Sequence, residues 1–181
     1  MDFAALDLGS NSFHLLVVRE AGNALTKLAS EKRTLGLGRY VKATGRLPRE
    51  AFEDALKAVE SLIRRARQFP GVRLNVVGTS ALRDAANGGE FAHAVAERTG
   101  VEIEIVSGET EARLVYQGAR HGHALPARIA VLDLGGGSVE IAVGDRESCR
   151  PLASLPLGFL RVGSARGVGG TLDLDIARAR T

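Results

Sequence analysis

An internal repeat constrains the fold of this chain more than any other feature of its sequence. Residues 7–17 read DLGSNSFHLLV and residues 133–143 read DLGGGSVEIAV, so Asp, Leu, Gly, Ser and Val recur at the same offsets. The separation is far longer than the ~20–50 residues of a solenoid repeat. The repeat therefore predicts two related domains or lobes, each carrying the same turn.

The glycine turn within each copy of the repeat lies between two short apolar segments. Residues 3–8 and 13–18 flank the first turn, and residues 129–132 and 139–143 flank the second, which predicts two β-hairpins. Alternation of strands with helices along the rest of the chain predicts an α/β fold. Further strands are expected over 24–34, 72–77 and 101–106, helices over 48–66, 90–99 and 109–119 (the last capped by Ser107), and a loop over 35–45.

The two glycine turns have the chemistry of an anion site. Glycine permits positive φ and close approach of the backbone to a ligand, and successive N–H groups in a tight turn form a concavity that suits phosphate. An Asp at the preceding strand end can hold a divalent cation or a water. Two such turns facing each other would hold a polyphosphate from both sides; the alternative is a pair of ordinary hairpin turns. Neither copy matches a Walker or dinucleotide-binding motif.

Composition excludes several classes of protein. The chain is 45% hydrophobic and 25% charged, which is typical of a globular protein. Its single cysteine, Cys149, excludes a disulfide framework. With 4% aromatic residues and no Trp, no base-stacking platform is expected, and a net charge of +3 does not argue for nucleic acid. Since there is no signal peptide and no apolar run of ~20 residues, we expect a soluble, cytoplasmic protein without a membrane partner.

Four motifs, in order, resemble the exopolyphosphatase / guanosine pentaphosphate phosphohydrolase (Ppx/GppA) family. They are DLGSNS at 7–12, GTSALR at 78–83, SGETEARL at 107–114 and DLGGGSVE at 133–140, followed by Leu157-Gly158 and Arg161. The resemblance implies an actin and sugar-kinase type fold, with ribonuclease-H-like domains built on a mixed sheet flanked by helices. We expect a complete first domain over residues 1–122 and an incomplete second domain over 123–181, as in a C-terminally truncated family member.

The resemblance also implies roles for individual residues. Glu111 matches the glutamate that activates the attacking water, and Glu109 is the neighbour most easily confused with it. Arg83 matches an arginine that contacts substrate phosphate. His14 is expected to be packed or paired rather than catalytic.

Mg²⁺ is the cofactor that the resemblance implies. Asp133 and Glu140 match the carboxylates that hold it, and Asp7 is the corresponding acid of the first turn. The phosphate-binding residues are expected to be Gly9, Ser10, Asn11, Ser12, Gly135, Gly136, Gly137 and Ser138.

The implied activity is Mg²⁺-assisted release of the terminal phosphate from inorganic polyphosphate or from guanosine pentaphosphate, the latter a link to the stringent response. The sequence favours neither substrate. A non-catalytic remnant that binds polyphosphate or a partner is one alternative, and a relative of acetate or sugar kinases is a weaker one. A homodimer is left open.

Overall fold

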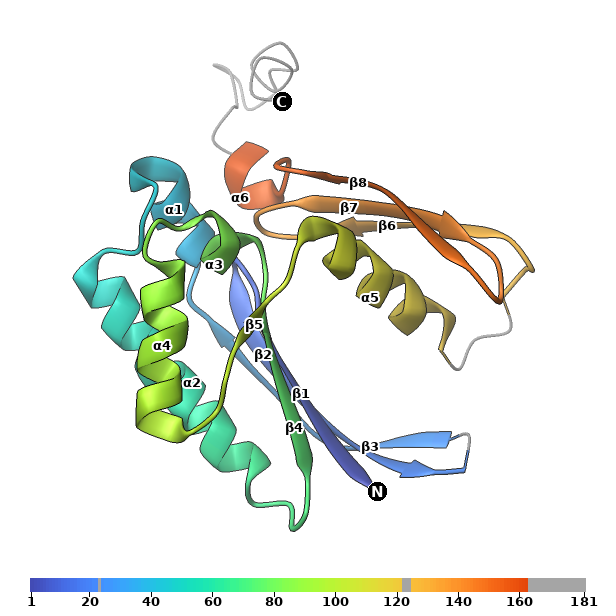
Figure 1. Cartoon of the computed structure of the whole chain (residues 1–181), viewed down its shortest axis with the longest axis horizontal. Helices are drawn as coiled ribbons and strands as arrows, with labels where there is room; N and C mark the ends of the chain where they lie inside the picture. The colour runs from blue at the N-terminus through green and yellow to red at the C-terminus, as the bar shows by residue number, and fades with distance from the viewer. Residues whose placement is uncertain (23, 122–124, 163–181) are drawn as a thin grey trace. The chain divides into compact units, whose positions relative to one another are not determined.

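The computed structural model describes residues 1–22, 24–121 and 125–162 and shows a mixed α/β architecture (Figure 1). By internal packing the chain divides into two units, Met1–Val106 and Ser107–Thr181. None of the described helices is both long and apolar enough to cross a membrane.

The first unit is built on a five-stranded mixed sheet of order β3-β2-β1-β4-β5. β1 pairs antiparallel with β2, as the predicted hairpin requires, and parallel with β4. The expected strand over 101–106 is reduced to two residues, which pair with the end of β4. The strands are β1 (Asp2–Leu8), β2 (Ser12–Ala21), β3 (Ala24–Thr34), β4 (Arg73–Gly78) and β5 (Glu104–Ile105).

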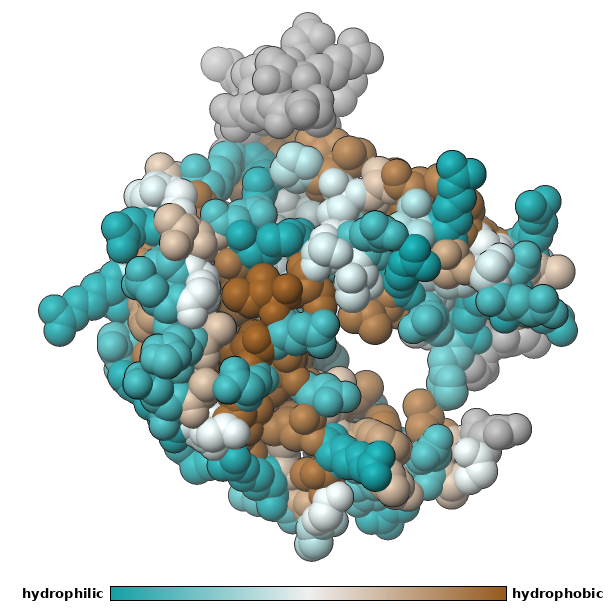
Figure 2. Space-filling view, viewed as in Figure 1, coloured by the Kyte–Doolittle hydropathy of each residue, from teal (hydrophilic) through white to brown (hydrophobic). Residues whose placement is uncertain are grey.

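Four helices belong to this unit: α1 (Leu37–Thr44), α2 (Arg49–Ala66), α3 (Ser80–Asp84) and α4 (Gly88–Thr99). α2 begins directly after Pro48, which needs no N–H at a helix start. Its apolar stripe, including Leu56, Val59 and Leu62, is buried in one cluster with Leu6 and Leu8 of β1. In Figure 2 the outer sides of α1 and α4 are mostly hydrophilic, and hydrophobic residues gather beside them over the sheet.

The expectation of a loop over 35–45 is wrong, because α1 occupies most of it. Gly36 and Gly45 have φ of 64° and 70° and mark the start and the end of this helix. Leu37 and Val41, four residues apart, are buried. The glycine-rich composition therefore marks helix ends here rather than a continuous loop.

The second unit consists of α5 (Gly108–Arg120), a three-stranded antiparallel sheet of order β6-β7-β8, and α6 (Phe159–Val162). The strands are β6 (Ile129–Leu134), β7 (Val139–Gly144) and β8 (Cys149–Leu155). Ser107 caps α5 as predicted, since its Oγ accepts a hydrogen bond from the Thr110 N–H at 3.1 Å. Ala112 and Tyr116 of α5 pack against Ala142 of β7.

Because of this packing, α5 groups with β6–β8 and the two units divide at Val106. The expected division after residue 122 places the same helix with the first domain. That residues 1–122 form a complete domain, and 123–181 the start of another, stays a prediction.

Candidate functional site

The two repeated glycine turns have the same hydrogen bond. In the first turn the Gly9 N–H donates to the Ser12 carbonyl at 3.2 Å, and in the second the Gly135 N–H donates to the Ser138 carbonyl at 3.0 Å. In both, the strand before the turn pairs with the strand after it in the same register. The sequence repeat is therefore a repeat of structure.

Close packing, not a left-handed backbone, explains the first glycine of each turn. Neither Gly9 nor Gly135 has a positive φ, so the expected conformational reason is wrong for both. A Cβ would lie 3.0 Å from the Ser12 carbonyl oxygen at Gly9, and 3.1 Å from that of Ser138 at Gly135. A side chain at either position would crowd the hydrogen bond that closes the turn.

The segment after β8 holds the second turn. The N–H groups of Phe159 and Leu160 donate to the carbonyls of Gly135 and Gly136 at 3.1 and 2.9 Å. Gly158 lies so close to Gly136 and Gly137 that a Cβ on it would overlap the backbone of the turn. The Leu157-Gly158 segment therefore fixes the turn from outside it.

The segment after β3 holds the first turn in the same way. The Leu35 and Gly36 N–H groups donate to the Asn11 carbonyl at 2.9 and 2.8 Å, and the Gly38 N–H donates to the Ser10 carbonyl at 2.8 Å. Both holding segments have the pattern Leu-Gly-x-x-Arg, at residues 35–39 and 157–161. This Leu-Gly-x-x-Arg pattern is a second block of the internal repeat, which the sequence analysis missed. Aligning the two halves of the chain beyond the glycine turns reveals it.

The hydrogen bonds from these two segments engage carbonyl groups of the turns, and several N–H groups of the turns are left without a backbone acceptor. Within the described residues, the N–H groups of Ser10, Asn11, Gly136 and Gly137 donate to no backbone carbonyl. A turn with occupied acceptors and available donors attracts an anion. Each turn thus has the chemistry of a phosphate site. One turn belongs to the first unit and the other to the second, and that they face each other stays a prediction.

A buried carboxylate lies beside the second turn. Asp133 and Glu140 are directly paired across β6 and β7, so their side chains share one face of the sheet. Glu140 is only 2% exposed, and its Oε1 accepts a hydrogen bond from Ser154 Oγ at 2.9 Å. Its Oε2 is buried without a hydrogen-bond partner among the described residues. A buried carboxylate oxygen without a partner is costly, so this position is suited to a positive group.

The donors fit Mg²⁺. In the described ranges no group of three or more His, Cys, Asp or Glu side chains could hold a metal ion by itself. Mg²⁺, however, is usually bound by one or two carboxylates with waters and substrate phosphates. The carboxylates of Asp133 and Glu140, beside a phosphate-type turn, are such a donor set.

The first turn lacks the second acid of this pair. Asp7 corresponds to Asp133, but its cross-strand partner is His14, where the second unit has Glu140. His14 is paired as expected, with its Nε2 2.9 Å from Ser30 Oγ. The paired carboxylates are therefore a feature of the second turn.

The predicted base lies on the helix that begins beside this carboxylate. A Cβ at Gly108, the first residue of α5, would overlap the side chain of Ser154, whose hydroxyl binds Glu140. Glu111 lies in the first turn of α5, and its N–H donates to the Ser107 carbonyl at 2.9 Å. The positive end of the helix dipole favours carboxylates at this position. The structure thus brings Glu111, Asp133 and Glu140 into one unit.

Glu109 has a different environment. It is exposed, and its Oε1 accepts a hydrogen bond from Arg113 Nη2 at 2.8 Å, one helical turn along. Its carboxylate is thus engaged in a surface ion pair. That Glu111 rather than Glu109 is the base stays a prediction.

Two other predicted residues lie in the first unit. Arg83 is on α3, where its Nη1 donates to the Val106 carbonyl at 2.9 Å and its Nε lies 3.9 Å from Asp84. Ser10 is buried, and its hydroxyl donates to Ser80 Oγ at 3.3 Å. The hydroxyl of Ser10 is therefore engaged within the first unit, while its N–H donates to no backbone carbonyl among the described residues.

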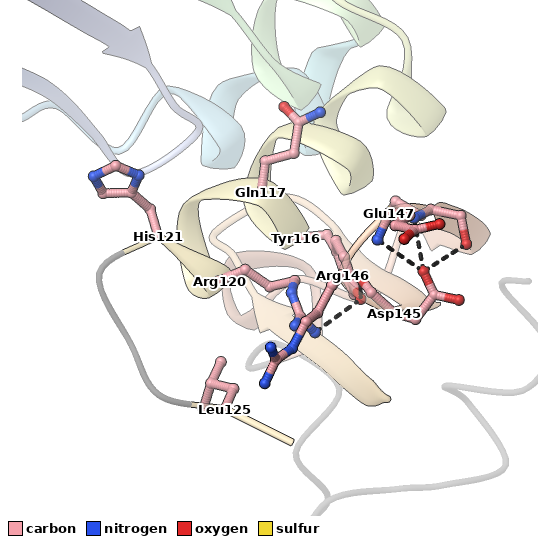
Figure 3. Close-up of a pocket in the computed structure, with 10 residues that line it drawn as sticks. Tyr116, Gln117, Arg120, His121, Leu125, Asp145, Arg146 and Glu147 are labelled. Atoms are coloured by element: carbon pink, nitrogen blue, oxygen red, sulfur yellow. Dashed lines mark hydrogen bonds between the residues drawn. The ribbon is translucent and has the colours of Figure 1, made fainter. Parts of the chain in front are cut away.

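A cavity of about 620 Å³ lies elsewhere in the second unit, between the end of α5 and the β7–β8 turn (Figure 3). Arg120 stacks over the Tyr116 ring at 5.9 Å, while Asp145 binds the backbone of its own turn. None of the predicted site residues lines this cavity. Its lining is Tyr116, Gln117, Arg120, His121, Leu125, Asp145, Arg146, Glu147, Ser148 and Cys149.

Comparison with known proteins identifies the class. Residues 16–165 match the model of the Ppx/GppA phosphatase family, and the chain belongs to this family. The crystal structure of the family member from Aquifex aeolicus superposes with a TM-score of 0.83 and 28% identity, over 98% of this chain and 58% of that one. An exopolyphosphatase from Cytophaga hutchinsonii gives a TM-score of 0.87 and 25% identity, over 99% and 58%.

The predicted fold class is also confirmed. The five-stranded mixed sheet flanked by helices is the ribonuclease-H-like arrangement of actin and sugar kinases. The ethanolamine utilization protein EutJ from Carboxydothermus hydrogenoformans, at a TM-score of 0.54 and 17% identity over 99% of this chain and 60% of that one, shares the fold alone. The chain spans a little under 60% of the length of the family structures that it matches.

Proposed function

We propose that this chain acts as a phosphohydrolase that releases the terminal phosphate of inorganic polyphosphate or of guanosine pentaphosphate. The observation that carries the proposal is the buried, unpaired Oε2 of Glu140 beside the Gly135–Ser138 turn. A free buried anion next to a phosphate-type turn fits a site that takes a cation and a phosphate together. The Aquifex and Cytophaga relatives support the same class of reaction.

In this proposal the chain neutralises the negative charge of the bound substrate before the reaction begins. The N–H groups of Asn11, Gly136 and Gly137 bind phosphoryl oxygens, and Arg83 adds a positive charge. Asp133 and Glu140, with Asp7 as the acid of the first turn, would hold Mg²⁺, which supplies Lewis-acid stabilisation of the phosphoryl oxygens when bound.

Glu111 then acts as the general base. Its carboxylate accepts a proton from the water that attacks the terminal phosphorus, and the bond to the bridging oxygen breaks as the water oxygen bonds. The shortened polyphosphate leaves with its new terminal oxygen negatively charged. Glu111 lies on α5 and Glu140 lies on β7, and both elements belong to the second unit.

The test is phosphate release by the purified chain. The two substrates are inorganic polyphosphate and guanosine pentaphosphate, each with and without Mg²⁺. We expect phosphate release that needs Mg²⁺, and the preferred substrate follows from the relative kcat/KM. Binding of polyphosphate without release would favour the non-catalytic alternative, and phosphate transfer from ATP to an acceptor would favour a kinase.

A further inference from the structure

Ser154 of β8 connects two parts of the proposed site. On one side its hydroxyl donates to Glu140 Oε1 at 2.9 Å. On the other side it lies against the backbone of Gly108, where α5 begins, so closely that no Cβ fits between them. α5 carries Glu111 in its first turn. Ser154 is thus packed between the helix of the base and the buried carboxylate.

A β-bulge places Ser154 in this position. Ala142 of β7 pairs with Pro151, but the residue before it, Ile141, pairs with Ala153 rather than Leu152. The extra residue shifts the register by one, and Ser154 rather than Ala153 stands opposite Glu140. A one-residue shift exchanges the faces of a strand, and bulges often re-aim a side chain next to an active site.

The first unit contains a related contact. Ser30 of β3 lies 2.9 Å from the ring of His14, which occupies the position of Glu140 in the repeat. A bulge again interrupts the pairing of β2 with β3, between Val17 and Val18. In both units a hydroxyl on the third strand contacts the side chain that follows the glycine turn, although Ser30 is offset by two residues from Lys32, the residue paired with His14.

We propose that Ser154 is a positioning residue that presents the free oxygen of Glu140 to the metal. This inference rests on the proposed function. The hydrogen bond to Oε1 fixes the orientation of the carboxylate, and Oε2 is the oxygen left without a partner. Mg²⁺ demands near-ideal octahedral geometry, and loss of an outer-shell partner typically weakens metal binding by about 10–100-fold.

The test measures Mn²⁺ binding, as a paramagnetic substitute for Mg²⁺, by titration of the full chain without substrate. We expect Ser154→Ala to raise the Kd for Mn²⁺ by about 10–100-fold. Ser148→Ala is the matched control, because Ser148 Oγ also donates to a carboxylate, that of Asp145, at 3.0 Å in the turn between β7 and β8. It should leave the Kd unchanged.

A double variant tests whether Ser154 acts through Glu140 or only supports the fold. In a Glu140→Gln background, Ser154→Ala should cause no further loss of Mn²⁺ affinity. If Ser154→Ala does not fold, Ser154→Cys keeps the shape with a weaker donor, and its Kd should be raised less.

The outcomes separate the two proposals. This inference is overturned if folded Ser154→Ala binds Mn²⁺ with the affinity of the unaltered chain, or if Ser154→Cys does so where only that variant folds. The proposed function still stands in that case if the unaltered chain releases phosphate in a Mg²⁺-dependent way. An unaltered chain that binds no Mn²⁺ and releases no phosphate overturns both.

Discussion

Two carboxylates on β7 and its turn show how the surroundings of a residue indicate its role. Asp145 accepts hydrogen bonds from the N–H groups of Glu147 and Ser148, at 2.9 and 2.8 Å, and from the Ser148 hydroxyl. Glu140 has one donor for two buried oxygens. The first carboxylate is satisfied by its own turn, and the second is not. Local structure therefore accounts for the surroundings of the Asp145 carboxylate, whereas the Oε2 of Glu140 is left for the metal in the proposed function.

The bonds to Asp145 predict a pH dependence of stability. Donation from the Glu147 and Ser148 backbone lowers the pKa of Asp145 below its ordinary value. Since the folded-state pKa is lowered, its stabilising effect is present above the unfolded pKa and is lost as pH falls through the folded pKa. We expect Asp145→Ala to unfold more easily than the unaltered chain at neutral pH. In denaturant titrations across pH the difference should vanish in acid; a difference that persists there would contradict this account.

At the scale of elements, the start of α5 is a closely packed part of the proposed site. Gly108 has no room for a Cβ beside Ser154, whereas Gly118 on the same helix has open space. Gly108→Ala should therefore displace the helix start and lower both stability and phosphate release. Gly118→Ala should stabilise the chain by about 0.5–1 kcal/mol, because alanine is the better helix former. Thermal unfolding and the phosphate assay check both, and equal effects of the two changes would contradict the packing.

Elements with strong local signals were predictable from sequence. The hairpin of β1 and β2 and the apolar stripe of α2 follow from periodicity and turn residues. α1 was missed because glycines at both of its ends look like a loop. Ser154 could not be predicted, since its place opposite Glu140 depends on a bulge, and a one-residue change of register is not visible in the sequence.

At the scale of the whole molecule, the two halves bury the same repeat differently. Leu8 of the first copy is fully buried, while its counterpart Leu134 is 69% exposed in the described structure. Leu8→Ala should lower the free energy of unfolding by about 2–5 kcal/mol. Leu134→Ala should change it by about 0.5 kcal/mol or less. Chemical denaturation measures both, and a large loss at Leu134 would show that this leucine is covered in solution.

The most direct test of the central claim is phosphate release by Glu111→Gln, with Glu109→Gln as the matched control from the same helical turn. With Mg²⁺ and saturating polyphosphate, Glu111→Gln should bind substrate normally and lose ~10²–10⁴-fold in kcat, because the general base is removed. Glu109→Gln should keep its activity, since Glu109 is exposed and paired with Arg113. An undiminished kcat in Glu111→Gln would contradict the assignment of the base and the site built around it.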